Sequence, residues 1–214
     1  MIPQNDKLHD MKRFIPLFLC LCALAGTTSA RNFKVGVRGG VNLSDYTFDP
    51  IRIDGTAFSP GSSRVGYEGG LVLRLDLSKH LHLQSELNYA AVRYEVRANN
   101  GSYERNIALR TQRFQIPVEL GVQLGVVRLF GGAQFRVAGS VHSSNRSLLQ
   151  AEFNDRNVSL IGGLGLNIRK FFIDFRVSGY PRARVWHRYT SHEITRRVSV
   201  PHDVVYGGSI GFFF

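Results

Sequence analysis

The chain has 214 residues, and its 27 lysines and arginines against 16 aspartates and glutamates give a formal net charge of +11. The basic residues are spread singly through alternating segments and loops. Nucleic-acid binding usually needs a basic stripe along one face, so we expect no nucleic-acid partner. After the first 30 residues no run of 18 apolar residues occurs, which excludes anchoring by transmembrane helices in that part of the sequence.

Residues 1–30 have the organisation of a secretory signal peptide. A basic pair precedes an apolar run over residues 14–25, which is too short to span a bilayer as a helix. Small residues at Thr28 and Ala30 suit the −3 and −1 positions of a cleavage site. We therefore expect cleavage after Ala30, which leaves a single domain of residues 31–214.

Met11 is a candidate for the true start, because the ten residues before it add acidic side chains that a signal peptide lacks. A lipoprotein is the alternative to a cleaved signal, since Cys20 and Cys22 lie in this segment. A leucine precedes each cysteine where a lipidation site wants a small residue, so the cleaved signal is preferred. The domain after residue 30 then has no cysteine for a disulfide, a thiolate metal site or a nucleophile.

Beyond residue 30, apolar and polar residues alternate with the period of a β-strand. The alternation predicts eight strands, near residues 33–42, 65–77, 81–89, 113–122, 127–137, 157–168, 171–178 and 205–214. Short turns are expected near residues 78–80, 123–126 and 169–170, and longer polar connections near 43–64, 95–110, 139–156 and 181–202.

Short turns at one end and long loops at the other are typical of outer-membrane barrels. We therefore predict an all-β fold, an eight-stranded antiparallel up-and-down transmembrane β-barrel in the outer membrane. A hairpin hidden in residues 43–64 or 181–202 would make ten strands. A soluble lipocalin also has eight strands, and alternation alone does not say which face is outside; the signal peptide, the charged face and the aromatic C-terminus favour the transmembrane barrel.

One face of the predicted strands carries twelve charges of both signs, which would be costly against lipid but can pair inside a narrow barrel. We expect them to form a charge network that plugs the interior; the alternative is the lining of a selective pore. Glycines on the same face are expected to make room for long arginines. The twelve residues are Lys34, Arg38, Glu68, Arg74, Asp76, Glu86, Arg113, Glu119, Arg128, Arg136, Asp174 and Arg176.

The last eleven residues, VVYGGSIGFFF, alternate between a larger apolar face and a face of mostly small residues. On the apolar face lie Tyr206, Ile210, Phe212 and Phe214. A C-terminal strand of this kind resembles the signal that the barrel-insertion machinery reads in outer-membrane proteins, which makes that machinery an expected partner.

Four segments, RNFKVGVRGGVNLS, RFQIPVELGVQ, LFGGAQF and VVYGGSIGFFF, carry a wider resemblance. Together they resemble the porin-family outer-membrane β-barrel domain of Bacteroidetes, a group that includes PorT-like proteins. The resemblance covers the domain after residue 30 and implies a barrel rather than a particular activity. Its most distinctive residue is Pro117, which cannot donate to a strand ladder and predicts a bulge or a weak point in pairing.

Enzymatic and metal sites are weakly indicated. Ser191, His192 and Glu193 are adjacent, so in an extended segment they point to opposite sides and predict no triad. His187, His192 and His202 match no tight metal-ligand spacing. We expect no catalysis, no metal and no cofactor, with a lipid-modifying enzyme as the weakest alternative.

The last long connection has a basic cluster at Arg182, Arg184, Arg188, Arg196 and Arg197. These side chains are either solvated or bind lipopolysaccharide phosphates or an envelope protein. The tyrosines and tryptophan near strand ends suit either an interfacial aromatic belt or loop packing; they are Tyr46, Tyr94, Tyr103, Tyr180, Trp186 and Tyr189.

The expected role is that of a monomeric envelope-structural or interaction protein, surrounded by outer-membrane lipid and presenting surface loops. A narrow porin or small-solute channel and a PorT-like secretion accessory are the alternatives.

Overall fold

The computed structural model describes residues 32–53, 55–62, 64–143, 150–154, 158–180, 185–191, 194–200 and 202–214. The expected signal peptide, with Ala30, lies outside these residues. In the part of the chain that is described, no helix is long and apolar enough to cross a membrane.

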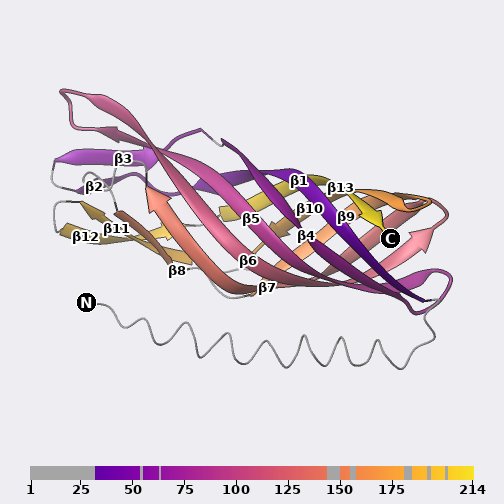
Figure 1. The fold of residues 1–214 in the computed structure, drawn as a ribbon. Coiled ribbons are helices and arrows are strands. Elements are labelled where there is room, and N and C mark those ends of the chain that lie inside the picture. Colours follow the sequence, from indigo (N-terminus) through magenta and orange to yellow (C-terminus); the bar gives the residue numbers. More distant parts are fainter. Residues whose placement is uncertain are drawn as a thin grey trace.

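Eight strands form a closed antiparallel barrel in which each strand pairs with its neighbours in chain order (Figure 1). Pairing of the first strand with the last closes the wall, since Gly36 lies opposite Phe213 and Thr47 opposite His202. The prediction of an eight-stranded up-and-down barrel is therefore confirmed. The barrel strands are β1 (Phe33–Thr47), β4 (Arg64–Asp76), β5 (Leu81–Asn99), β6 (Glu104–Leu124), β7 (Val127–Ser143), β9 (Val158–Ile168), β10 (Phe171–Gly179) and β13 (His202–Phe213).

The barrel has a turn end, with the connections at residues 77–80, 125–126 and 169–170, and a loop end opposite to it (Figure 1). The longer connections contain further strands outside the barrel wall. A hairpin of β2 and β3 pairs onto the far end of β5, and β8, β11 and β12 form a separate three-stranded sheet. Their bounds are β2 (Ile51–Ile53), β3 (Thr56–Pro60), β8 (Gln150–Asn154), β11 (Val185–Ser191) and β12 (Ile194–Val200).

The prediction of a long connection over residues 95–110 is wrong in its bounds. Strands β5 and β6 stay paired as far as Asn99 and Glu104, so the turn itself occupies only residues 100–103. Gly101 has a φ of 87°, the left-handed conformation that the Asn-Asn-Gly-Ser tip predicts. The two strands consequently project well beyond the rest of the barrel at the loop end (Figure 1).

Polar side chains fill the barrel and apolar side chains cover its outer wall. Arg74 and Arg128 are 2% and 0% exposed, whereas Leu71 and Leu164 are 51% and 53% exposed. A lipocalin would show the reverse distribution, with charges outside and an apolar interior. The arrangement is that of a barrel surrounded by hydrocarbon.

Pro117 interrupts one of the two hydrogen-bond ladders of strand β6. Residues of β5 and β6 pair from Leu81 to Ser85 and resume at Asn88 without a change of register, so the pairs that would involve Ile116 and Pro117 are missing. Towards β7 the ladder continues through Pro117 opposite Gln134. This gap is the weak point in pairing that a strand proline predicts.

A second, apolar core occupies the loop end. It joins the inward faces of projecting β5 and β6 to the β2–β3 hairpin and to the chain after β1. Tyr94 is buried in this core, so for this residue the structure supports loop packing rather than an aromatic belt. We call this cluster the loop-end core; it consists of Phe48, Ile53, Phe58, Val92, Tyr94, Val96, Ala98, Ile107 and Leu109.

Candidate functional site: the barrel interior

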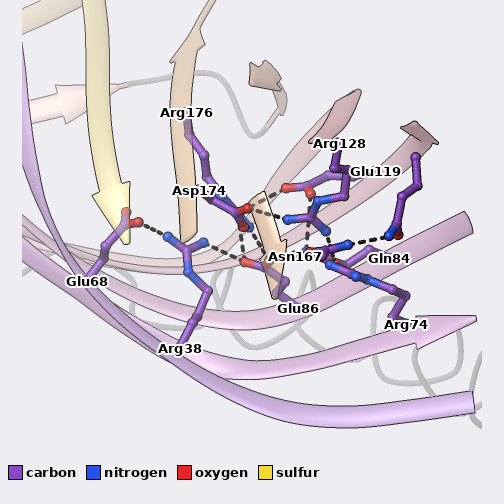
Figure 2. Close-up of polar contacts among 11 residues, drawn as sticks. Arg38, Glu68, Arg74, Gln84, Glu86, Glu119, Arg128, Asn167, Asp174 and Arg176 are labelled. Carbon is purple, nitrogen blue, oxygen red and sulfur yellow. Dashed lines mark hydrogen bonds and ion pairs between the residues drawn. The ribbon is translucent and has the colours of Figure 1, made fainter. Parts of the chain in front are cut away.

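Glu86, on β5, is the centre of the polar interior (Figure 2). Its Oε2 accepts hydrogen bonds from Arg38 Nη1 at 2.7 Å and from Arg176 Nη1 at 2.9 Å. Its Oε1 accepts a bond of 2.5 Å from Arg176 Nη2. Glu86 is fully buried, and two guanidinium groups supply the charge and hydrogen bonds that compensate for its lost hydration.

From this centre the contacts spread to the other strands. Arg38 also pairs with Glu68, and Arg176 pairs with Glu119 at 3.0 Å and with Asp174 at 3.2 Å. Figure 2 shows these side chains converging from opposite walls of the barrel. The contacts therefore tie together strands that are far apart in the sequence.

Gln84 brings two more arginines into the same set of contacts. Its Oε1 accepts bonds from Arg128 Nη1 at 2.7 Å and from Arg74 Nε at 2.9 Å, while its Nε2 donates to Glu86 at 2.7 Å. Arg128 also pairs with Asp174. We call the whole set the ion network; its four cations and four anions balance, and they are Arg38, Arg74, Arg128, Arg176, Glu68, Glu86, Glu119 and Asp174.

An apolar layer lies beside the ion network towards the turn end. Val72, Phe172 and Phe213 form a buried cluster, and the Arg74 guanidinium lies 4.5 Å from the centroid of the Phe213 ring. Arg128 similarly lies 4.9 Å from the centroid of the inward-pointing Phe130. The alternation of the sequence predicts charged and polar residues inside the barrel, and no such aromatic layer.

Two of the inward glycines make room for these rings. A Cβ at Gly211 would collide with Phe172, and one at Gly163 would lie 2.6 Å from Phe130 Cζ. Of the glycines expected to accommodate arginines, only Gly165 has an arginine, Arg128, in that position; the expected glycines were Gly66, Gly70, Gly163, Gly165, Gly207 and Gly211. The expectation about arginines is therefore mostly wrong, and the signal it overlooked was the phenylalanines on the neighbouring strands.

Four of the twelve predicted interior residues lie outside the ion network. Lys34 and Asp76 form a pair of 2.8 Å at the turn-end rim, where their side chains are 46% and 29% exposed. They are therefore rim residues rather than deep interior ones. Arg113 and Arg136 lie nearer the loop end and donate to the hydroxyls of Tyr94 at 3.2 Å and Tyr180 at 2.5 Å.

A polar vestibule lies between the ion network and the loop end. Its empty volume, with its open mouth included, is about 560 Å³. Arg38, Glu68 and Arg176 contribute to its lining from the ion network, and Arg113 and Asn88 from further towards the loop end. Asn42, which also lines it, has a buried side-chain amide with no hydrogen-bond partner among the described residues. The vestibule can therefore hold water.

Several other predicted features fall on residues that are not described. These are His192, Glu193, Arg182 and Arg184, together with the side chains of His187, Arg188, Arg196, Arg197 and His202. Among the residues that are described, no group of three or more histidine, cysteine, aspartate or glutamate side chains could hold a metal ion. In the C-terminal strand, Tyr206, Ile210 and Phe214 are exposed on the outer wall and Phe213 is buried inside, as alternation predicts.

The sequence from residue 12 to residue 178 matches the family described as outer membrane protein beta-barrel domain. Among solved structures, OprG from Pseudomonas aeruginosa has a TM-score of 0.52 at 13% identity, over 86% of this chain and 96% of OprG. The attachment invasion locus protein Ail of Yersinia pestis, in complex with the heparin analogue sucrose octasulfate, has a TM-score of 0.43 at 14% identity, over 86% of this chain and 99% of Ail. A search of curated proteins found no significant match. The match over most of the sequence and the inside-out barrel lead to one conclusion: the chain belongs to the outer membrane protein beta-barrel domain family and is a protein of the outer membrane.

Proposed function

We propose that this protein is a non-conducting barrel that serves the envelope as a structural or interaction protein, with its turn end in the periplasm and its loop end outside the cell. The main observation that supports this proposal is the balanced ion network next to the apolar layer. Arg74, Glu86, Arg128 and Phe172 are at most 2% exposed, so no water-sized path passes these described side chains. An eight-stranded barrel has an interior that its own side chains can fill, which agrees with this role.

Energetics support a permanently closed interior. Opening a path would separate several buried ion pairs, and removing one partner of such a pair typically costs about 3–5 kcal/mol. Glu86 alone contacts Arg38, Arg176 and Gln84, so its movement would disturb all three. A closed barrel acts through its outer surfaces, and the projecting loop end with its own apolar core is the part that a partner outside the cell would meet.

Planar-bilayer recordings test the closed interior. The full chain should insert, shown by heat-modifiable migration on gels, without a stable open conductance. An Arg128→Ala/Asp174→Ala/Arg176→Ala variant removes three interior side chains and should give small, steady conductance steps. The control Lys79→Ala, at the exposed periplasmic turn, should remain silent. Steady conductance from the unaltered protein would contradict the proposal.

A small-solute channel is the second candidate, and the vestibule favours it. The vestibule leads from the loop end to Arg38, Glu68 and Arg176, where the ion network closes it. A channel would need this network to open during transport. Uptake of small charged solutes into proteoliposomes would support the channel, whereas uptake no faster than in protein-free vesicles would support the closed barrel.

The proposal includes no cofactor, no chemistry and a monomer in outer-membrane lipid. The insertion machinery is the proposed partner of the C-terminal strand, because Tyr206, Ile210 and the 70% exposed Phe214 lie on its lipid-facing side. A PorT-like role in secretion rests on sequence resemblance alone. A deletion strain that fails to export cargo proteins would support that role, and a deletion strain with normal export would exclude it.

A further inference from the structure

Three arginines form a row across the outer wall where the barrel meets its loop end. Arg64 of β4 lies directly opposite Arg93 of β5, and Arg93 lies directly opposite Arg110 of β6. Across the next strand, Arg110 is opposite His142 of β7. Residues in direct register have side chains on the same face of a sheet, about 4.5–5.5 Å apart at Cβ. We call Arg64, Arg93 and Arg110 the basic row.

A bulge in β4 completes the row. The outward side chains of this strand fall on odd-numbered residues, such as Leu71 and Tyr67, so an even-numbered Arg64 would ordinarily point inward. One extra residue between Arg64 and Tyr67 shifts the register against β5. The bulge therefore turns Arg64 to the outer face, as bulges commonly re-aim a side chain at a barrel rim.

The basic row borders the apolar part of the outer wall. On β5 the outward residues up to position 91 are mostly apolar, and residues 81–91 match the approximately 9–11 residues that a tilted strand needs to cross a bilayer. Tyr67, Tyr89 and Phe114 form an aromatic ladder there, with ring centroids 6.3 and 5.2 Å apart. Aromatic residues of this kind mark the headgroup level of a membrane.

The arginines contact this ladder directly. The guanidinium carbons of Arg93 and Arg110 lie 5.8 and 5.3 Å from the centroid of the Tyr67 ring. Arg110 also donates a hydrogen bond to the Tyr67 hydroxyl. The ring thus holds two positive charges at the height of the lipid headgroups.

The charges of the basic row are only partly balanced by the protein. Arg64 pairs with Glu95 at 3.0 Å, and this carboxylate raises the pKa of the Arg64 guanidinium above its usual value. Arg93 and Arg110 have no acidic partner among the described residues, and Arg110 Nε is buried with no hydrogen-bond partner there. One step further from the membrane, Arg97 is again paired, with Glu104 at 3.0 Å. Arg93 and Arg110 therefore leave two charges at the headgroup level that no described carboxylate compensates.

Two like charges directly opposite each other destabilise a sheet unless an anion joins them. Guanidinium groups bind phosphate oxygens in a two-pronged geometry, and arginine is preferred where such binding is needed. We propose that Arg93 and Arg110, with Arg64 beside them, bind the phosphate groups of a phosphorylated glycolipid in the outer leaflet. This inference concerns the outer wall and does not depend on whether the barrel conducts.

The test refolds the full chain in zwitterionic detergent micelles and titrates lipopolysaccharide while following the midpoint temperature of the heat-modifiable gel shift. Binding to the folded state raises this midpoint with ligand concentration, which gives an apparent dissociation constant. The test variant is Arg93→Gln/Arg110→Gln. The control, Arg52→Gln/Arg105→Gln, makes the same change in charge at exposed loop-end residues outside the row.

We expect the test variant to bind lipopolysaccharide at least about tenfold more weakly than the unaltered protein, because each basic residue near an anionic surface contributes measurably to binding. The control should bind as the unaltered protein does. Dephosphorylated lipopolysaccharide and inorganic phosphate should leave the midpoint unchanged, which separates a headgroup from a free ion. Equal binding by both double variants, or an equal effect of the dephosphorylated lipid or of inorganic phosphate, would overturn the proposal. If the test variant does not refold, Arg93→Gln alone should weaken binding at least threefold, and unchanged binding would overturn the proposal equally.

Discussion

Strand β5 crosses two regions with opposite side-chain distributions. In residues 81–89 the inward side chains are polar, among them Gln84 and Glu86, and the outward ones are mostly apolar. Further along the same strand Val96 points inward and is buried in the loop-end core, while Arg97 is exposed on the outer wall. Strand β6 shows the same inversion, since Glu119 is buried in the first region and Ile107 in the second.

The comparison shows that the surroundings decide which face of a strand is polar. Next to hydrocarbon, apolar side chains gain nothing by moving inside, and charges are tolerated only where they can pair in the interior. In water the hydrophobic effect acts again and fills the interior with apolar side chains. The two rules meet at the basic row, where the outer wall changes from tyrosine and phenylalanine to arginine.

The largest expected effect comes from the centre of the ion network. Glu86→Gln keeps the shape of the side chain but leaves Arg38 and Arg176 without their shared carboxylate. The free energy of unfolding should fall by about 3–5 kcal/mol, measured by urea unfolding in lipid vesicles. Glu104→Gln, at the exposed loop end, should change it by less than about 0.5 kcal/mol. A loss below 1 kcal/mol for Glu86→Gln would show that the network contributes little.

A charge on the outer wall should be tolerated in only one of the two regions. Leu87→Arg, in the membrane region of β5, should cost about 2–4 kcal/mol of unfolding free energy. Arg97→Leu, on the same face beyond the membrane, should change it by less than about 0.5 kcal/mol. The measurement is again urea unfolding in vesicles. Equal losses of unfolding free energy for the two variants would mean that positions 87 and 97 have the same surroundings, which contradicts the account.

A cavity in the loop-end core should destabilise this region without destabilising the rest of the barrel. Ile107→Ala should destabilise this region by about 2 kcal/mol, near the low end for such truncations because a site close to the end of the barrel can partly collapse. Hydrogen exchange should quicken in residues 48–58 and 92–98, with little change for the amides of β9 and β10. Equal loss of protection throughout the barrel would mean that the two regions unfold as one unit.

The smallest effect is expected at the turn-end rim. Lys34 and Asp76 are partly exposed, so Lys34→Met should lower the free energy of unfolding by at most about 1 kcal/mol. The difference from the unaltered protein should shrink as salt is added, because an exposed pair is screened. A larger loss that does not depend on salt would assign this pair to the buried network.

The sequence predicts the barrel well because alternation determines side-chain facing directly. Tyr206 and Ile210 lie outside and Ser209 inside, and the wall closes with eight strands as expected. Residues 95–110 were harder to predict because their charges resemble a loop. In the structure, Arg97 and Glu104 are the water-facing side of strands whose other side fills the loop-end core.

The interior could be predicted only in part. Alternation identifies Arg38 and Glu86 as inward residues, but their contact depends on how the strands are staggered around the barrel, which one strand's sequence does not reveal. Phe172 points inward despite being aromatic, because Gly211 on the neighbouring strand leaves space for its ring. The basic row was missed for a related reason: Arg64, Arg93 and Arg110 are far apart in the sequence and meet only through register.

Fluorophore quenching along β5 tests the central claim most directly. Single cysteines at Leu83, Leu87, Gln84, Asn88 and Arg97, with Cys20 and Cys22 replaced by serine, would be labelled and the protein folded into vesicles of brominated lipid. Strong quenching is predicted at positions 83 and 87 and weak quenching at 84, 88 and 97. Equal quenching at neighbouring positions, or quenching at 97 as strong as at 87, would contradict the inside-out barrel and its reversal beyond the membrane.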